Sequence, residues 1–309
     1  MQHFRNIDEL QLHACALTIG SFDGVHLGHQ AIIQQLVSAA RELSIPSAVL
    51  TFYPHPSVVL QGRRPSFYIT SPEEKAARLG GLGVDYVITQ KFDRSLSLMG
   101  AIEFLQWAKA QLQFRMLWVG ENFALGYKRE GDVRFLKAIS EDLAFEFHVV
   151  APVFVDGEII SSTRVREALR SGDVARVAHY LGQPFLLRGV VEPGLGRGKK
   201  LGIPTANLKI WDERAYPGAG VYACLTRVNG GTYKTVVNIG VRPTFDDGLE
   251  APLIEAHLLD FSGSLYEKEI ELSFMHRLRK ERRFNGPQDL IAQIQRDIER
   301  ARMILDQNP

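Results

Sequence analysis

The sequence has few of the features that mark disulfide-rich, zinc-binding or membrane-spanning proteins. Cys15 and Cys224 are its only cysteines, and each lies inside an apolar, strand-like run. We therefore expect neither a disulfide framework nor a zinc site, and a reducing cytoplasm fits this composition. No apolar run is long enough to cross a bilayer, and the first residues lack the apolar segment of a signal peptide. These absences predict a cytoplasmic protein without a membrane partner.

An excess of charge of one sign is also missing. The 36 lysine and arginine residues nearly balance the 35 aspartate and glutamate residues, which gives a net charge of +1. Such a balance provides no general attraction to nucleic acid or to an anionic membrane. The sequence also has no internal repeat, no low-complexity tract and no basic helix-turn-helix pattern. We expect no nucleic-acid partner.

At 309 residues the chain is longer than a single compact core usually is, and its pattern changes part-way. Over residues 1–183, apolar runs alternate with helical spacing, a βαβα rhythm that predicts an α/β domain with a doubly wound parallel sheet. Over residues 184–309, short strands separated by glycine and proline predict a small antiparallel β-barrel or sandwich closed by a helix. We therefore expect two domains with these bounds.

Local patterns place the individual elements. In the first domain they predict strands over 14–19, 47–52, 84–88, 116–120 and 147–150, and helices after residue 29, from about 71, over 101–112 and from about 162. In the second domain they predict strands over 186–191, 220–228, 232–239, 253–259 and 269–274, and a helix after residue 287.

The densest chemistry of the sequence lies in the turn that joins the first buried strand to the first helix. This histidine turn, residues 20–29, reads Gly-Ser-Phe-Asp-Gly-Val-His-Leu-Gly-His and carries His26 and His29. Open α/β sheets bind ligands at the carboxyl ends of their strands, and N–H groups at a helix N-terminus suit phosphate. The histidines can hold the charge that develops when a nucleotide phosphate is attacked. The turn predicts a nucleotide site, against the alternative of two surface histidines in a capping loop.

Two further segments of the first domain bear on this site. Asn122 follows the strand at 116–120, so its amide would either hydrogen-bond a ligand at the same sheet edge or cap its own loop. Ser162 or Thr163 would cap a helix that carries Arg166 near its first turn. These groups suit a polyphosphate, although a plain capping box explains them equally well. Paired with the histidine turn, they predict the end of the site that holds the β- and γ-phosphates.

In the second domain a glycine-rich stretch runs from Gly194 to Asn207 and contains four glycines and three cations. A loop rich in N–H groups and positive charge suits polyphosphate, but the spacing of a Walker A loop is missing. Thr205 and Asn207 present neutral oxygens that can coordinate Mg²⁺ beside bound phosphates. The alternative is an ordinary surface hairpin followed by a turn.

Glu255 lies within a strand-like run of the second domain. If Leu253 and His257 share its face, the carboxylate points to the interior or the mouth of the barrel. A carboxylate at a barrel mouth can accept a hydroxyl proton during phosphoryl transfer. A cross-strand ion pair with an arginine is the alternative.

These motifs carry a family resemblance. Gly-x-Phe-Asp-Gly-Val-His-x-Gly-His and Ile-Ser-Ser-Thr-x-Val-Arg are similar to the two nucleotide motifs of the bacterial bifunctional riboflavin kinase/FAD synthetase family, and 51–56 and 120–126 match its pattern too. In the second domain, Gly-Arg-Gly…Pro-Thr-Ala-Asn, 238–245 and 255–261 resemble its riboflavin kinase module in sequence and order. The resemblance covers nearly the whole chain, with residues 92–99 as a divergent segment.

The resemblance implies an FMN adenylyltransferase domain over 1–183 and a riboflavin kinase domain over 184–309, both using ATP with Mg²⁺. It implies that His26 and His29 stabilise the α-phosphate, that Arg166 helps to hold the polyphosphate, and that Glu255 activates the ribityl 5′-hydroxyl. It implies Mg²⁺ contacts for Thr205 and Asn207. It further implies nucleotide or flavin-phosphate contacts for Gly20, Phe22, Asp23, Gly28, Asn122, Ser162, Thr163, Gly196, Arg197, Lys200, Thr205 and Asn207.

We therefore expect an enzyme that makes FMN from riboflavin and ATP, releasing ADP, and then FAD from FMN and ATP, releasing pyrophosphate. One alternative is a nucleotidylyltransferase of the same type with another phosphate acceptor. A second is a flavin-sensing protein without turnover. The residues of each half suit its predicted reaction. The hydroxyl nucleophile of the kinase benefits from a base such as Glu255, whereas the anionic phosphate of the adenylyltransferase needs mainly charge stabilisation by histidine and arginine.

Overall fold

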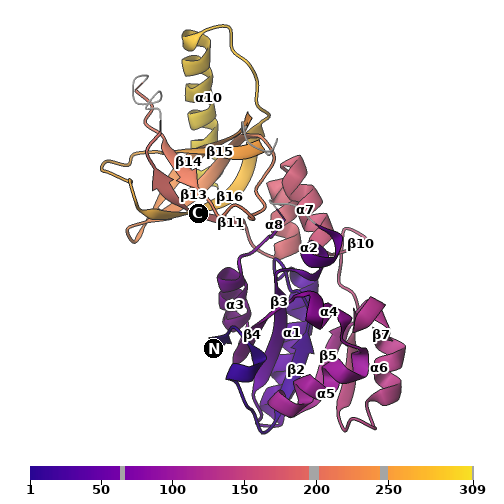
Figure 1. Cartoon of the computed structure of the whole chain (residues 1–309). Coiled ribbons are helices and arrows are strands. Elements are labelled where there is room, and N and C mark those ends of the chain that lie inside the picture. Colours follow the sequence, from indigo (N-terminus) through magenta and orange to yellow (C-terminus); the bar gives the residue numbers. More distant parts are fainter. Residues whose placement is uncertain (63–66, 195–201, 244–249, 308–309) are drawn as a thin grey trace. The chain divides into compact units, whose positions relative to one another are not determined.

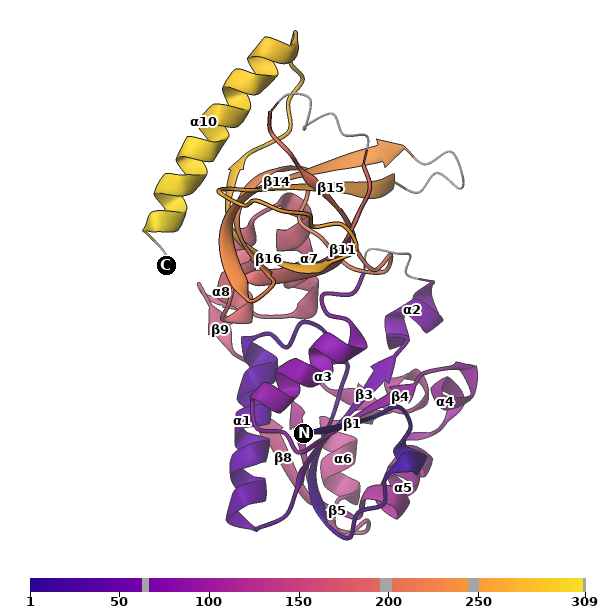
Figure 2. The same ribbon diagram turned by 90° about the vertical axis from the view of Figure 1, so that its left-hand side faces the viewer.

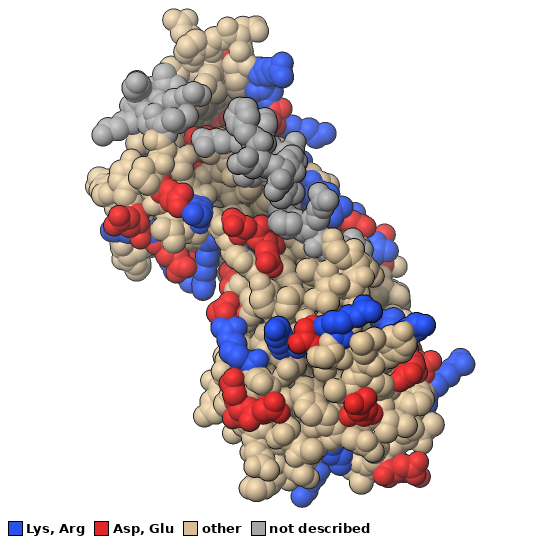
Figure 3. All heavy atoms as spheres, viewed as in Figure 1, with Lys and Arg blue, Asp and Glu red and all other residues tan. Residues whose placement is uncertain are grey.

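The computed structural model describes residues 1–62, 67–194, 202–243 and 250–307. The chain forms two compact units, Met1–Ser162 and Thr163–Pro309. The first is built on a parallel sheet and the second on a closed barrel (Figure 1). On the face drawn in Figure 3, acidic and basic side chains are interspersed, as the balanced composition leads one to expect. Within the described ranges, no helix is both long and apolar enough to cross a membrane.

The first unit alternates strands and helices along the chain. Its strands are β1 (Gln2–Phe4), β2 (Cys15–Ile19), β3 (Ser47–Tyr53), β4 (Tyr86–Lys91), β5 (Phe114–Gly120), β6 (Ala124–Leu125), β7 (Gly131–Asp132), β8 (Glu146–Val150), β9 (Phe154–Val155) and β10 (Glu158–Ile159). Its helices are η1 (Ile7–Glu9), α1 (Leu27–Glu42), α2 (Pro56–Gln61), α3 (Pro72–Gly81), α4 (Arg94–Leu98), α5 (Ala101–Leu112), η2 (Tyr127–Arg129) and α6 (Val133–Ile139).

The six-stranded sheet of this unit has the order β1-β4-β3-β2-β5-β8, and its strands are parallel. Successive residues of a strand face opposite sides, so Leu17 and Leu50 pack in the core that contains α5, while Ala16 and Val49 pack in the core that contains α1 and α3. Helices thus cover both faces, and the predicted doubly wound sheet is confirmed. The chain leaves β2 toward β3 and returns to β5 on the other side of β2. That reversal is the switch point at which open α/β sheets bind ligands.

The second unit begins with two helices and continues as a barrel (Figure 2). Its elements are α7 (Ser162–Ser171, whose first residue belongs to the first unit), α8 (Val174–Leu181), β11 (Phe185–Glu192), β12 (Ala206–Lys209), β13 (Gly220–Val228), β14 (Gly231–Pro243), β15 (Glu250–Leu258), β16 (Glu269–Arg279) and α10 (Pro287–Asp306). The strands close in the order β11-β12-β15-β14-β13-β16, and neighbours are antiparallel. Large side chains such as Phe185, Tyr222 and Phe274 fill the interior, so the barrel is a packed core.

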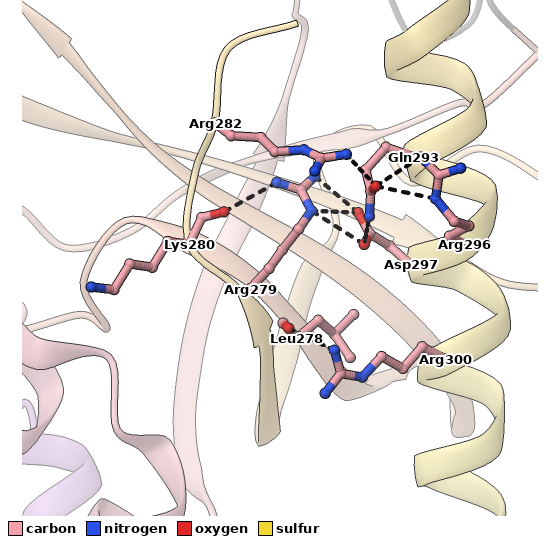
Figure 4. Close-up of polar contacts among 8 residues, drawn as sticks. All are labelled: Leu278, Arg279, Lys280, Arg282, Gln293, Arg296, Asp297 and Arg300. Carbon is pink, nitrogen blue, oxygen red and sulfur yellow. Dashed lines mark hydrogen bonds and ion pairs between the residues drawn. The ribbon is translucent and has the colours of Figure 1, made fainter.

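Helix α10 is fixed to the barrel by apolar contacts and by a buried ion pair. Ala301 and Leu305 pack against Val221 and neighbouring residues on the outer face of the strands. Asp297, 4% exposed, accepts hydrogen bonds from Arg279 on β16, with a distance of 2.9 Å between Nε and Oδ2 (Figure 4). Arg300 adds a hydrogen bond from the helix to the carbonyl oxygen of Leu278 on this strand, and Gln293 donates to Asp297 within the helix. The C-terminal helix predicted from sequence is confirmed, and it packs on the outer face of the barrel.

The compact units do not divide where the sequence pattern changes. Helix α8 packs against β11 and β16, and Arg277 of β16 donates to the carbonyl oxygen of Ser171 at 2.7 Å. The two helices before the barrel therefore belong to the second unit by packing, whereas the prediction placed them in the domain over 1–183. An amphipathic helix does not reveal which of two cores it covers. The division of activities at 183/184 stays a prediction.

Candidate active sites

The backbone of the histidine turn is wound unusually tightly. Phe22 and Val25 both have φ of 46°, and Gly24 between them has φ of 83°. A Cβ at Gly24 would lie 2.9 Å from Cγ2 of Ile69, so this position requires glycine for space as well as for its backbone conformation. The winding brings His26 to the N-cap of α1, where its side chain accepts a hydrogen bond from the backbone N–H of His29 at 3.4 Å.

The two histidine rings stack on each other at the N-terminus of α1. Their centroids are 3.6 Å apart with 19° between the planes, and Phe22 packs edge-on against His29. A Cβ at Gly28 would lie 3.2 Å from the His26 ring, so glycine leaves the space that the ring occupies. Nδ1 of His29 is buried without a hydrogen-bond partner among the described residues. The stack therefore presents an unused ring nitrogen at a helix N-terminus, a suitable place for an anionic group.

The ionisation of His29 is set by its surroundings. Desolvation, then the neighbouring His26 and then Lys75, hold the pKa of His29 well below its ordinary value. The imidazole is therefore neutral at neutral pH, because stacked like charges away from water are unfavourable. A neutral imidazole keeps one N–H donor and one acceptor.

Asp23 and Ser162 link the histidine turn to other segments. The Asp23 carboxylate, 2% exposed, accepts from the backbone N–H groups of Ile69 at 3.0 Å and of Thr70 at 3.1 Å. The Ser162 hydroxyl donates to the carbonyl oxygen of Asp23 at 2.9 Å. Both residues thus hold the shape of the turn, a task that the sequence did not reveal. Their contacts with a nucleotide stay predictions.

The other residues predicted to contact the nucleotide lie after β2, after β5 and in α7. Gly20 and Asn122 follow β2 and β5, the neighbouring strands at the switch point, and Asn122 is exposed. Thr163 lies in the first turn of α7 and Arg166 directly follows that turn; both are counted with the second compact unit. The approach of these two residues to the histidines stays a prediction.

A cavity of about 470 Å³ opens at the carboxyl end of β4. Asp93, Leu96 and Leu98 of the segment 92–99 line it, together with Glu103 and Trp107 of α5. The segment that diverges from the family pattern therefore borders an open space on the edge of the sheet that also carries the histidine turn.

On the barrel, three polar side chains form a row across neighbouring strands. Asn207 of β12 pairs with Glu255 of β15, and Glu255 pairs with Asn238 of β14. Directly paired residues share a face, so this amide–carboxylate row lies on one side of the barrel wall. Ile254 and Ala256, which flank Glu255, are buried. The row therefore faces outward and not into the barrel interior, because the strand places its apolar residues inside. Of the two orientations expected for Glu255, the interior was wrong, and the mouth of the barrel stays a prediction.

The chain around Asn207 is closely packed, as the contacts of Gly194 and Pro204 show. A Cβ at Gly194 would lie 2.0 Å from the amide nitrogen of Asn207, so a side chain there would displace the asparagine. Nδ1 of His257 lies 2.7 Å from the carbonyl oxygen of Pro204, which fixes the residue before Thr205. The amide and hydroxyl oxygens of Asn207 and Thr205, with the Glu255 carboxylate nearby, are the hard oxygen donors that Mg²⁺ prefers. The predicted loop residues Gly196, Arg197 and Lys200 lie outside the described residues.

Comparison with known proteins assigns these two regions. The family model for FAD synthetase matches residues 8–164, and the model for riboflavin kinase matches residues 181–305. A protein of Haemophilus influenzae named bifunctional riboflavin kinase/FMN adenylyltransferase is 36% identical over 293 residues, covering 94% of each chain. A protein of the same name from Pseudomonas fluorescens is 37% identical and covers 98% of each chain. The chain belongs to the bifunctional riboflavin kinase/FMN adenylyltransferase family.

As a member of this family, the enzyme phosphorylates riboflavin to FMN and adenylylates FMN to FAD, with ATP as the co-substrate of both reactions. The resemblance read from the motifs is thus confirmed, with the two modules in the predicted order. The whole fold is also similar to a crystal structure described as a macrolide-efflux protein from Streptococcus pneumoniae. The TM-score is 0.89 at 28% identity, over 97% of this chain and 98% of that one.

Sequence reasoning missed one residue next to the histidine turn. Lys75 of α3 is 6% exposed, and its ammonium donates to the carbonyl oxygen of Ser21 at 2.9 Å. The signal was present, because Pro72, Lys75, Ala76 and Leu79 follow the spacing of a buried helical stripe. A lysine on such a stripe indicates a buried charge.

Proposed function

We propose that the histidine turn is where the α-phosphate of ATP is attacked during FAD synthesis. The observation that carries this assignment is the stacked pair of His26 and His29 at the N-terminus of α1, with a buried ring nitrogen that has no partner among the described residues. The FMN phosphate is already anionic at neutral pH, so the step needs little proton removal. It needs stabilisation of the charge that grows on the α-phosphate oxygens, which imidazole and backbone N–H groups supply.

The remaining nucleotide residues divide along the polyphosphate. In this proposal Arg166, with the hydroxyls of Ser162 and Thr163, holds the β- and γ-phosphates that leave as pyrophosphate. Asn122 contacts the nucleotide or the flavin phosphate from the neighbouring strand end. The activity domain then extends over residues 1–183, which includes the helices that pack with the barrel.

We further propose that riboflavin is phosphorylated at the amide–carboxylate row. Glu255 accepts the proton of the ribityl 5′-hydroxyl as the oxygen attacks the γ-phosphorus. Asn207 and Thr205 hold Mg²⁺ together with the nucleotide phosphates, and the metal supplies neutralising charge there. The close fit of Gly194 against Asn207 supports this assignment, since it fixes the amide in place. Gly196, Arg197 and Lys200 are proposed to contact the phosphates.

The balanced charge and the two buried cysteines support a cytoplasmic enzyme whose partners are small molecules, without nucleic acid or membrane. We propose this location and partner set alongside the site assignments.

The test is a product-resolved assay of two variants. We expect Glu255→Gln to abolish FMN formation from riboflavin while FAD formation from supplied FMN persists. We expect His29→Ala to stop FAD formation while FMN accumulates from riboflavin. Circular dichroism of each variant checks that it is folded. If either substitution removed both activities from a folded protein, the assignment of separate sites would be wrong.

A further inference from the structure

A lysine ammonium is buried directly beneath the histidine turn. Lys75 lies in the first half of α3, after the capping box formed by Ser71 and Glu74. Its side chain points to the sheet rather than to water and is 6% exposed. Lysine is rarely buried to this extent, because removing an ammonium group from water is costly unless other groups compensate for it.

The contacts of the ammonium join the turn to the carboxyl end of β3. Nζ of Lys75 donates to the carbonyl oxygen of Ser21 at 2.9 Å and to the hydroxyl oxygen of Thr51 at 2.8 Å. The carbonyl oxygen of Phe52 lies 3.5 Å away. The Thr51 hydroxyl itself donates to Ser21 O at 3.0 Å. Ser21 precedes the left-handed stretch of the turn, so Lys75 fixes the point from which the turn begins to wind.

Other bonds already tie this region of the chain to the turn. The Asp23 carboxylate accepts a hydrogen bond from the backbone N–H of Ile69, which precedes α3. Arg78 of α3 donates to the carbonyl oxygen of Gly24 at 3.3 Å. If Lys75 only helped to hold the turn against α3, a neutral side chain at this position would do the same. What distinguishes Lys75 is a charge that contacts only neutral oxygens within the described residues.

The charge acts on His29. Burial lowers the pKa of Lys75 to about 8, against the opposing influence of Asp23 and Glu73, so the group is still largely cationic at neutral pH. The nearby positive charge lowers the pKa of His29, after the larger effects of burial and of His26. Perturbed groups of this kind gather where an enzyme sets the protonation state of its site.

We propose that Lys75 is a positioning residue for FAD synthesis: it fixes the Ser21 carbonyl group from which the histidine turn winds, and it places a positive charge beside the site proposed for the reacting phosphates. A neutral His29 offers both a donor and an acceptor nitrogen, and the Lys75 charge adds attraction for the phosphates without touching them. This inference rests on the proposed role of the histidine turn.

The test compares Lys75→Met, which removes both charge and hydrogen bonds, with Lys75→Gln, which keeps a donor but loses the charge. In the full chain we expect kcat for FAD formation from FMN to fall about 10- to 100-fold in Lys75→Met, less than the roughly 100- to 1,000-fold loss of a donor that touches the developing charge, because Lys75 acts through the turn. KM for ATP should change little, because Lys75 does not touch the substrate. FMN formation from riboflavin should be unchanged, and the exposed Lys137→Met serves as the matched control.

A second readout separates charge from packing. Without the ammonium, the pKa of His29 should rise in both variants, so the acid limb of the pH profile of kcat should move to higher pH. Histidine ring signals in NMR titrations, assigned with His29→Gln, check the same shift. A packing role alone would lower kcat without moving the acid limb. The proposal is overturned if the acid limb stays in place in either variant, or if Lys75→Met keeps kcat within about two-fold of the parent.

The same two variants give a linkage test in the native protein. Between about pH 8 and pH 10, folded Lys75 releases its proton while the unfolded residue still holds it, so this group makes stability rise with pH. The difference in unfolding temperature between the parent and Lys75→Gln should change over this window; a constant difference would contradict a charged, buried Lys75. If His29→Ala retained FAD formation, the site assignment itself would fail, which is distinguishable from failure of the role of Lys75.

Discussion

The two candidate sites differ in their surroundings: one is a turn at the edge of a buried sheet, and the other is a row of side chains on the outer face of a barrel. The histidine turn follows β2, a strand buried on both faces; its winding uses left-handed residues, and a buried lysine donates to its Ser21 carbonyl oxygen. The amide–carboxylate row lies on the outer face of a barrel whose interior is filled by aromatic and aliphatic residues. The difference matches the nucleophiles of the two proposed reactions. In our proposal, fixed dipoles and imidazole in a shielded turn serve an anionic phosphate, while a carboxylate on an accessible face serves a neutral hydroxyl.

The two units also obtain their rigidity differently. The sheet unit divides its apolar residues between two cores, one on each side of the sheet, and the turn is held by long-range bonds such as Asp23 to Ile69. The barrel unit has a packed interior and a helix fixed by the Arg279–Asp297 ion pair. Changes at each set of contacts should therefore disturb one activity and spare the other.

The largest expected effect is on the stability of the barrel. Asp297→Ala leaves the partly buried Arg279 guanidinium without its carboxylate partner, which should lower the free energy of unfolding of this unit by about 3 kcal/mol, the lower end of the loss for a fully buried pair. Calorimetry should show the barrel transition at a lower temperature, while FAD formation from supplied FMN continues below it. Asp260→Ala removes the exposed pair with Arg302 and serves as the control that changes little. An equal loss in both units would contradict their independence.

A smaller expected effect concerns the kinase site alone. Gly194→Ala would force the Asn207 amide to move, and a displacement of about 1 Å at a reacting site can cost on the order of 100-fold in rate. We expect FMN formation to fall at least 10-fold with FAD formation from FMN unchanged, measured by separate assays. Gly81→Ala, whose Cβ would meet nothing within 4 Å, is the matched control. Full kinase activity in Gly194→Ala would show that the position of Asn207 does not matter.

The smallest expected effect tests the structural task of Asp23. Asp23→Ala leaves the N–H groups of Ile69 and Thr70 without their acceptor, at a cost of about 1–3 kcal/mol. The sheet unit should unfold at a lower temperature and FAD formation should fall with it, while FMN formation persists. The exposed Asp142→Ala is the control. Loss of FAD formation with unchanged unfolding temperature would instead assign Asp23 to the nucleotide.

What the sequence could predict was mostly local. The helix α5 was predicted over 101–112, the bounds that the structure has, and Ser71 caps α3 with Pro72 at the first position, because caps and apolar spacing are read within a few residues. Strand β12 was missed since its four residues follow a proline and resemble a turn.

Features that depend on distant residues were not accessible in the same way. The outward face of Glu255 follows from its register with Asn207 and Asn238 on other strands. The hydrogen bond from the Ile69 N–H to the Asp23 carboxylate joins residues 46 positions apart, and no local sequence pattern near Asp23 predicts it. The packing of α8 on the barrel also depends on tertiary contacts, since its apolar stripe suits either core.

The most direct test of the two-site account mixes two full-length variants, each of which lacks one of the two activities. With riboflavin, ATP and Mg²⁺, neither Glu255→Gln nor His29→Ala should make FAD alone, because the first cannot form FMN and the second cannot use it. An equimolar mixture should make FAD, since FMN released by His29→Ala is a substrate for Glu255→Gln. Absence of FAD from the mixture, with both proteins folded and each retaining its remaining activity, would contradict the account.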